Sequence, residues 1–168
     1  MDLKFNITMK RIFLTIATAA LFSVNVFAAD GGKKANESSA TVSYAVQQEF
    51  TTDFAGAENV TWTVTKNCQK ADFVIDGAKK TAFYNLNGDF LGTTQVIGYN
   101  AIPAKTQKLI ADEYKGFVAS GVIVYQANEA VNDEIDPTSY FVDLKSSNHE
   151  LLVRVTSNGK IDFFKQVK

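Results

Sequence analysis

The sequence has little of what small disulfide-rich folds and nucleic-acid-binding proteins require. Its 168 residues include one cysteine, Cys68, and one histidine. A single cysteine excludes a fold held together by internal disulfides. The 17 Lys and Arg residues are balanced by 18 Asp and Glu residues, so no positive excess is present to displace the counterions of a nucleic acid. Because 46% of the residues are hydrophobic, the composition indicates a globular protein and excludes extensive disorder.

Long apolar runs are absent apart from the one at residues 12–26. Lys10 and Arg11 precede this run, and small residues follow it at Ala28 and Ala29. A basic start, an apolar middle and a small-residue exit are typical of a signal peptide. The run has about 15 residues, fewer than the roughly 20 that span a bilayer. The sequence therefore predicts a signal peptide over residues 1–28, with a transmembrane anchor or a buried helix as the alternative.

No cysteine lies near the predicted cleavage site, so we expect neither a lipid anchor nor another stable membrane anchor. Residues 29–41 are mostly small and polar. Such a segment buries too little apolar area to offset the entropy lost on ordering, which predicts a flexible leader. Together these features predict a periplasmic or secreted protein.

The rest of the chain shows one pattern twice, a helix followed by four short strands. Tyr44, Val46, Phe50 and Phe54 have roughly helical spacing, and residues 59–65 alternate strictly between apolar and polar. Three of the apolar stretches are followed by a dipeptide that is typical of hairpin turns, Asp-Gly in one case and Asn-Gly in the other two. The expected helices cover residues 43–55 and 103–115, and the expected strands cover 59–65, 73–75, 81–86, 89–97, 121–127, 140–145, 151–156 and 161–167.

Consecutive hairpins make a sheet antiparallel, and amphipathic helices cover one face of it. The pattern therefore predicts an α+β fold with a curved antiparallel sheet of about eight strands and two helices packed on one face. The domain covers residues 42–168, with two degenerate tandem repeats at about 42–101 and 102–168. The alternative is a chance similarity of two β-meanders.

Three stretches carry a resemblance to a known family. They are Phe50 to Trp62, with Phe-Ala-Gly-Ala-Glu-Asn-Val-Thr-Trp at its end, Ala82 to Gly88, and Ile102-Pro103 through Tyr114 to Phe117. They are similar to the PepSY-like, β-lactamase-inhibitor-protein-like family of exported bacterial proteins, over most of the chain from about Val46. The resemblance implies a tandem repeat of helix plus antiparallel strands in a non-catalytic exported protein. It also implies that the open face of the sheet, with its loops, grips a partner.

The residues that could carry catalysis or metal binding are sparse. Cys68 and His149 are far apart in the sequence and lie in expected turns, so they do not indicate a nucleophile with its base. The acidic residues Glu129, Asp133, Glu134 and Asp136 lack the spacing and the central glycine of a calcium loop, and favour a solvated hairpin tip. The sequence therefore predicts no enzyme activity, no cofactor and no metal site.

The remaining candidate for a functional site is the surface of the sheet. Strand alternation places two groups of side chains on the face that the helices leave open. A face that mixes aromatic and hydrogen-bonding groups suits recognition of a protein or peptide, although an ordinary solvated face is the alternative. The predicted function is an exported binding module, with an inhibitor or modulator of an envelope peptidase or hydrolase as the second hypothesis. The candidate binding residues are Thr61, Thr63, Thr65, Phe141, Asp143, Lys145, Arg154 and Phe164; the oligomeric state is left open.

Overall fold

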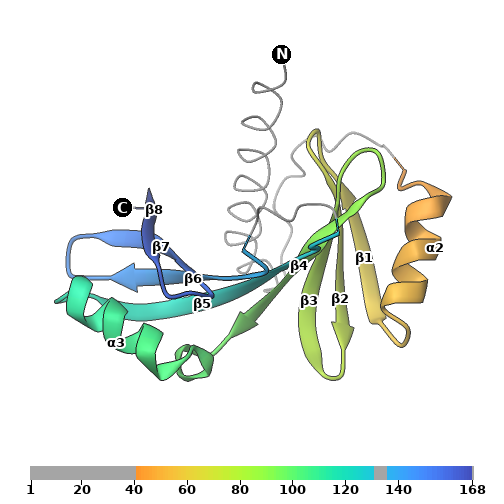
Figure 1. Cartoon of the computed structure of the whole chain (residues 1–168). Coiled ribbons are helices and arrows are strands. Elements are labelled where there is room, and N and C mark those ends of the chain that lie inside the picture. The colour runs from red at the N-terminus through yellow and green to blue at the C-terminus, as the bar shows by residue number, and fades with distance from the viewer. Residues whose placement is uncertain (1–40, 131–135, 168) are drawn as a thin grey trace, which may run out of the picture. The chain divides into compact units, whose positions relative to one another are not determined.

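The structure is a computed structural model that describes residues 41–130 and 136–167 (Figure 1). Eight strands lie in one open sheet in the order in which they occur along the chain, and two α-helices accompany them. This confirms the predicted α+β class with its antiparallel sheet. The predicted signal peptide and all but the last residue of the predicted leader lie outside the described residues. The elements are α2 (Tyr44–Asp53), β1 (Glu58–Val64), β2 (Gln69–Ile75), β3 (Ala78–Tyr84), β4 (Phe90–Ile97), η2 (Tyr99–Ala101), α3 (Ala104–Glu113), β5 (Val118–Ala127), β6 (Thr138–Lys145), β7 (Glu150–Thr156) and β8 (Ile161–Gln166).

The chain divides into two compact units between Leu91 and Gly92. Unit 1 holds α2, β1–β3 and the first residues of β4, and unit 2 holds the rest of β4, α3 and β5–β8. Each helix is followed in sequence by four strands, which is the element order that the sequence pattern predicts. The assignment of sequence repeats at about 42–101 and 102–168 stays a prediction. No helix in the described part of the chain is long and apolar enough to cross a membrane.

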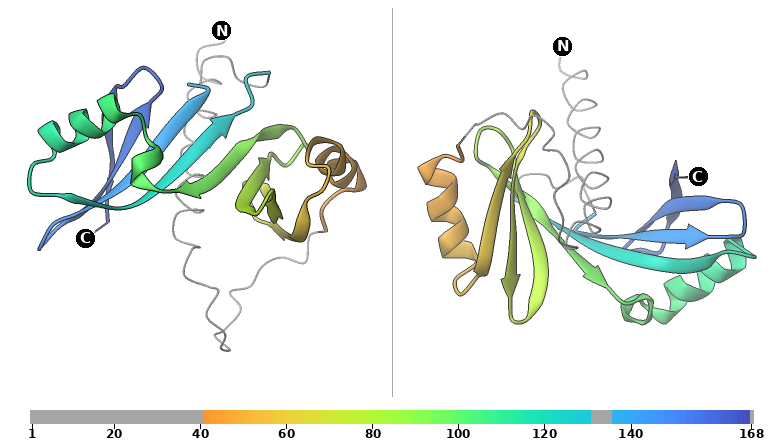
Figure 2. Two further views of the ribbon diagram at one scale, coloured as in Figure 1. Left: turned by 90° about the horizontal axis from the view of Figure 1, so that it is seen from below. Right: turned by 180° about the vertical axis from the view of Figure 1, so that it is seen from behind.

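Helix α2 begins and ends through local signals in the sequence. The hydroxyl of Ser43 accepts a hydrogen bond from the backbone N–H of Val46 at 3.3 Å, which satisfies one of the free donors of the first turn. At the other end the N–H of Phe54 donates to the carbonyl of Phe50 at 2.9 Å, and Gly56 adopts a φ of 89°. In Figure 2, α2 lies beside the strands of unit 1 in both views.

Hairpins connect the strands of unit 1 at the predicted turns. Asp76 and Gly77 join β2 to β3 with φ angles of 51° and 74°, as a two-residue hairpin with positive φ at both positions requires. Strand β2 is longer than the predicted 73–75, because Lys70 and Asp72 interrupt the apolar pattern while still pairing with β1 and β3. Their side chains form an ion pair at 3.5 Å on the face away from α2. The search for apolar stretches therefore underestimated the length of a strand in which every second residue is polar.

An aromatic cluster forms the core of unit 1. The ring of Phe50 on α2 lies 5.1 Å from Phe54, 5.2 Å from Trp62 and 5.0 Å from Phe73, measured between ring centroids. Trp62 is on β1 and Phe73 on β2, so one helical side chain ties two strands together. Tilted and edge-on rings at these separations are favourable geometries. The alternation of apolar and polar residues along residues 59–65 thus directs Trp62 toward the helix.

Tyr84 on β3 carries a buried polar group within this cluster. Its side chain is fully buried, and its hydroxyl has no hydrogen-bond partner among the described residues. Burial raises the pKa of the phenol above its ordinary value of 10.0, and the carboxylates of Asp53 and Glu49 raise it further. A buried hydroxyl without a partner costs free energy that a phenyl ring of the same shape does not.

Replacing Tyr84 with phenylalanine is therefore expected to leave the free energy of unfolding unchanged or raise it by up to about 1 kcal/mol at neutral pH. The effect grows in alkali. The unfolded chain releases the phenol proton as the pH rises above 10.0, while the folded protein retains it, so wild-type stability falls with rising pH in this range. Tyr84→Phe removes that loss. Urea unfolding at neutral and alkaline pH measures it, with exposed Tyr44→Phe as the control, and a neutral-pH loss above about 1 kcal/mol contradicts the account.

Unit 2 has a separate core beneath α3. The backbone N–H groups of Thr106 and Gln107 donate to the carbonyl of Pro103, which starts the helix one residue after the proline that the sequence points to. Ile110 of α3 and Ile102 before it are buried against the central strands of this unit. These strands contribute the buried core residues Val122, Val142, Leu144, Val153 and Val155. Helix α3 thus covers one face of β5–β7.

Candidate functional site

The two residues with catalytic potential serve the turns in which they lie. Cys68 is buried in unit 1, and its backbone N–H donates to the hydroxyl of Thr65 at 3.1 Å. His149 is exposed in unit 2, and its N–H and carbonyl bond to Ser146 across the β6–β7 turn. The interactions that the structure gives for these two residues therefore stabilise turns. The sequence interpretation of His149 as a turn residue agrees with this placement.

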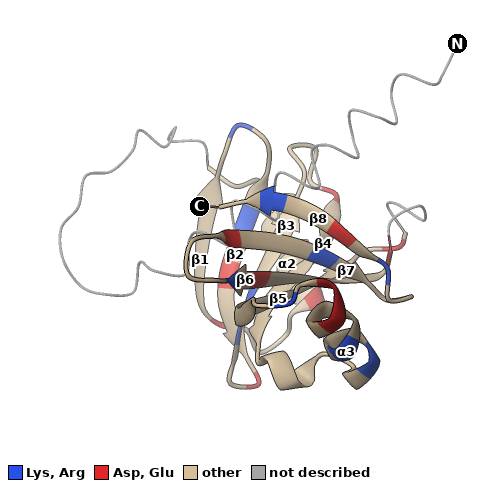
Figure 3. Ribbon diagram, turned by 90° about the vertical axis from the view of Figure 1, so that its left-hand side faces the viewer, with Lys and Arg blue, Asp and Glu red and all other residues tan. Residues whose placement is uncertain are grey.

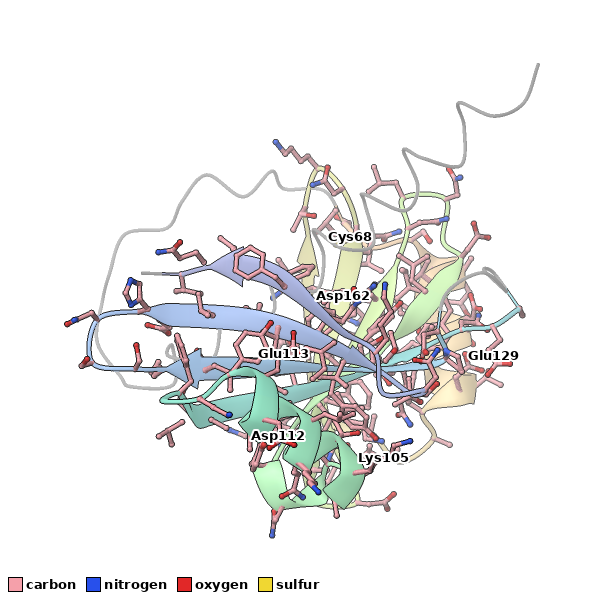
Figure 4. The ribbon with its side chains drawn as sticks, turned by 60° about the vertical axis from the view of Figure 1, so that its left-hand side comes forward. Cys68, Lys105, Asp112, Glu113, Glu129 and Asp162 are labelled. Atoms are coloured by element: carbon pink, nitrogen blue, oxygen red, sulfur yellow. The ribbon has the colours of Figure 1, made fainter. Side chains whose placement is uncertain are left out.

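The acidic residues that Figure 4 labels come from different parts of unit 2. Figure 4 shows Asp162 on β8, Asp112 and Glu113 on α3, and Glu129 beyond the end of β5. The carboxylate of Asp136 accepts hydrogen bonds from the backbone N–H of Ser157 at 3.1 Å and from the Ser157 hydroxyl at 2.9 Å. Asp133 and Glu134 lie outside the described residues. Among the residues that are described, no three potential ligands form a group that could hold a metal ion.

The threonines of β1 divide into two environments. Thr61 pairs with Asp72 and Thr63 pairs with Lys70 across the β1–β2 ladder, so both lie on the face of unit 1 away from α2. Thr65 follows the last residue of the strand, Val64. Its hydroxyl donates to the carbonyl of Cys68 at 3.0 Å and accepts two backbone N–H groups. Thr65 is therefore placed as a turn residue, separate from the strand face of Thr61 and Thr63.

Cross-strand pairing in unit 2 builds one continuous face from five strands. Val96 of β4 lies opposite Ile123 of β5, Ile123 opposite Phe141 of β6, Phe141 opposite Arg154 of β7, and Arg154 opposite Asp162 of β8. Residues directly opposite each other share a face, so these five form one row on the side away from α3. The open face, as we call this side, comprises Thr94, Val96, Ile123, Tyr125, Ser139, Phe141, Asp143, Lys145, Glu150, Leu152, Arg154, Thr156, Asp162 and Phe164.

The centre of the open face is apolar and the aromatic side chains in it are packed. Phe141 and Phe164 meet edge to face with centroids 5.2 Å apart. Phe141 is only 3% exposed, and Ile123 and Leu152 are buried as well. The Phe141 ring is therefore shielded from solvent, whereas Val96 at one end of the row is 55% exposed. Alternation along the strands assigned Phe141 to this side of the sheet but gave no measure of its depth.

Ion pairs surround this apolar centre. Arg154 donates to Asp162 at 2.9 Å, and Lys160 lies 2.8 Å from the other carboxylate oxygen of Asp162. Lys145 lies 3.3 Å from Asp143 and 3.2 Å from Glu150. Basic and acidic segments alternate along β6–β8 in Figure 3. The face therefore has no charge of a single sign that would select a polyanion.

The pairs shift the proton affinities of their members in the expected directions. Hydrogen bonds to Glu150 and Asp143 raise the pKa of the Lys145 ammonium. Hydrogen bonds from Lys160 and Arg154 lower the pKa of the Asp162 carboxyl. Each shift favours the charged form of its group, the ammonium of Lys145 and the carboxylate of Asp162. One carboxylate oxygen of Asp143, Oδ1, is buried and has no hydrogen-bond partner among the described residues.

Sequence reasoning missed several residues of this face. Only the strand pairing places three of them on this face, namely Val96, Ile123 and Leu152. Tyr125 lies on the same face, and burial raises its pKa to about 12. A run such as Val122–Tyr125 is apolar at every position, so alternation cannot separate its two faces. The signal that identifies the face is the pairing of Ile123 with Phe141.

Solved structures share this α+β fold. A BLIP-like (β-lactamase-inhibitor-protein-like) protein from Bacteroides fragilis matches 76% of this chain over 88% of its own, with 19% identity and a TM-score of 0.64. A DUF2874 family protein from Bacteroides uniformis matches 76% of this chain over 91% of its own, with 17% identity and a TM-score of 0.67. A protein from Bacteroides eggerthii, described as a proposed periplasmic protein, matches 76% of this chain over 88% of its own, with 17% identity and a TM-score of 0.63.

These likenesses show that the chain has the BLIP-like fold, as the resemblance in its sequence implies. No protein-family model matches the chain, and no curated protein matches it. Because the identities are low, the shared property is the arrangement of helices and strands.

Proposed function

We propose that this chain is an exported, non-catalytic module that binds a protein or peptide through the open face of unit 2. The observation that carries the proposal is the row from Val96 to Asp162, which joins an exposed apolar end to a packed aromatic centre and a charged end. Exposed Val96 and exposed Lys145 on the same face supply the apolar and the charged contacts that protein interfaces combine. Export is supported by the signal-peptide pattern of residues 1–28 and by the neighbour described as periplasmic.

The experiment begins with the processed protein as bait in a crosslinking capture from the cell envelope, read by mass spectrometry. Val96→Arg is expected to lower the affinity for the captured partner at least about tenfold, since a bulky charge replaces an exposed apolar contact in the row. Leu86→Arg is the matched control, because Leu86 is 56% exposed and lies in unit 1. Isothermal titration calorimetry compares the two. Equal affinities for both variants would exclude the open face as the binding surface.

Inhibition or modulation of an envelope peptidase or hydrolase is the second candidate. It is favoured by the BLIP-like description of one solved neighbour. Assaying any captured hydrolase with and without an excess of the protein distinguishes a ligand that blocks the enzyme from one that merely binds it. Lost enzyme activity that Val96→Arg restores supports inhibition through the same face. Unchanged activity at saturating protein leaves plain binding as the function.

A further inference from the structure

Strand β1 is an edge of the sheet; it pairs regularly with β2 from Thr61 to Val64, and its register shifts between Glu58 and Thr61. Among the described strands it pairs only with β2. Val60 is 37% exposed and Thr61 is exposed as well. The outer side of an edge strand presents backbone N–H and C=O groups that have no partner within the sheet, and such an edge is a template for a further chain.

The register of the β1–β2 hairpin shows which backbone groups face outward. The N–H of Thr65 donates to the carbonyl of Cys68 at 2.8 Å, and Thr63 and Thr61 follow at the alternate positions opposite Lys70 and Asp72. In an antiparallel ladder these alternate residues direct their N–H and C=O groups to the neighbouring strand. The groups of Trp62 and Val64 therefore point away from β2, toward the open edge.

The side chains along this edge are self-complementary. Residues 60–64 read Val-Thr-Trp-Thr-Val in both directions. When two such strands pair antiparallel about a two-fold axis at Trp62, Val60 meets Val64 of the second copy, Thr61 meets Thr63, and Trp62 meets Trp62. Threonine, aromatic and β-branched pairs of this kind are the favourable ones between strands. A two-fold interface requires that one surface matches itself, which this sequence achieves.

Charge also favours a second copy at this edge. Residues 59–64 carry no charge, so no like charges oppose each other along this stretch. The other edge strand, β8, carries Asp162 and Lys165, and such charges protect an edge from further pairing.

The helix beside β1 offers no charge that would oppose the approach. Glu49 and Asp53 of α2 act on Tyr84 of β3, so their side of the helix faces β3. Helical spacing places Tyr44, Gln47 and Thr51 on the opposite flank, toward β1. Tyr44 is 75% exposed. This flank is uncharged and carries an exposed aromatic ring that a second copy would cover.

We propose that the edge of β1 pairs antiparallel with β1 of a second copy of this chain, about a two-fold axis at Trp62. The pairing adds backbone hydrogen bonds at Trp62, whose N–H and C=O groups point away from β2, and joins the sheets of two copies. It uses the edge of unit 1, so it is independent of the open face of unit 2 that is proposed above to bind a partner.

Sedimentation velocity of the processed protein over a range of concentrations tests this pairing. The wild type is expected to sediment as a reversible dimer. Thr61→Lys with Thr63→Lys places like charges opposite each other twice and is expected to raise the dimer dissociation constant at least about tenfold. Ser147→Lys with Asn148→Lys, in an exposed turn of unit 2, adds the same charge and is expected to leave the dimer intact. A wild type that is monomeric at every concentration overturns the proposal.

A charge exchange tests the register. The chain with Thr61→Glu and Thr63→Glu is expected to be monomeric alone and to form a one-to-one dimer when mixed with the double lysine variant, since every opposed pair then joins unlike charges. In a second test, Thr61→Cys and Thr63→Cys chains crosslink when mixed under oxidation, because this register sets their Cα atoms about 4.5 Å apart. Double variants that stay apart when mixed, or cysteine chains that fail to crosslink, overturn the pairing.

Discussion

Replacing Gly92 with alanine is expected to lower the free energy of unfolding by about 3 kcal/mol or more. Gly92 has a φ of 145°, a conformation that residues with a side chain rarely adopt. A Cβ atom there would overlap the carbonyl oxygen of Gln126 and lie 2.9 Å from the Tyr125 hydroxyl and 3.0 Å from the Ala127 Cα. Backbone atoms of β5 cannot move aside as a flexible side chain can, so β4 and β5 would separate locally.

Gly121→Ala is the matched control for this substitution. Gly121 also lies in unit 2 on β5, yet its φ is not in the positive region and nothing lies within 4 Å of the position of its Cβ. We expect a change of less than about 0.5 kcal/mol for Gly121→Ala in urea unfolding. Similar losses at the two sites would show that the approach of β4 to β5 at Gly92 is not as close as described.

Phe50→Ala is expected to cost about 3–5 kcal/mol, the usual range for removing a buried phenylalanine from a core. The ring of Phe50 packs on Phe54, Trp62 and Phe73 at once, so its loss opens a cavity between α2 and two strands. Trp62 is the only tryptophan of the chain, and its fluorescence therefore reports on unit 1. The unfolding transition measured by that fluorescence should move to markedly lower urea.

The control for Phe50→Ala is Leu86→Ala, also in unit 1. Leu86 is largely exposed, so its truncation should change the free energy of unfolding by less than about 0.5 kcal/mol. Far-ultraviolet circular dichroism follows both units together. If Phe50→Ala leaves the tryptophan transition where it is in the wild type, the aromatic cluster does not hold unit 1 together.

Much of the fold could be predicted because local signals agree with it. Alternation from Val60 to Val64 directs Trp62 to the helix, and Asp76-Gly77 supplies both positive φ angles of its hairpin. Strand β2 was predicted too short because Lys70 and Asp72 are polar, yet they pair with each other on the outer face. A strand with one polar face at a sheet end gives a weak apolar signal.

The candidate site was harder to predict, because it depends on register and depth. The sequence placed Phe141, Asp143, Lys145, Arg154 and Phe164 on one face, and the strand pairing of unit 2 gives them a common side. It could not show that Phe141 is buried or that Val96 joins the same row from β4, since neither follows from alternation within a strand. Thr65 was read as part of a strand, and its hydroxyl instead closes a turn.

The binding role of the open face is tested most directly by covalent side-chain footprinting of the protein alone and with its captured partner. We expect the partner to protect Val96, Lys145 and Phe164, while Leu86 and Tyr44 of unit 1 react equally in both states. Protection confined to α3 or to unit 1, or the capture of no partner from the native envelope, would contradict it.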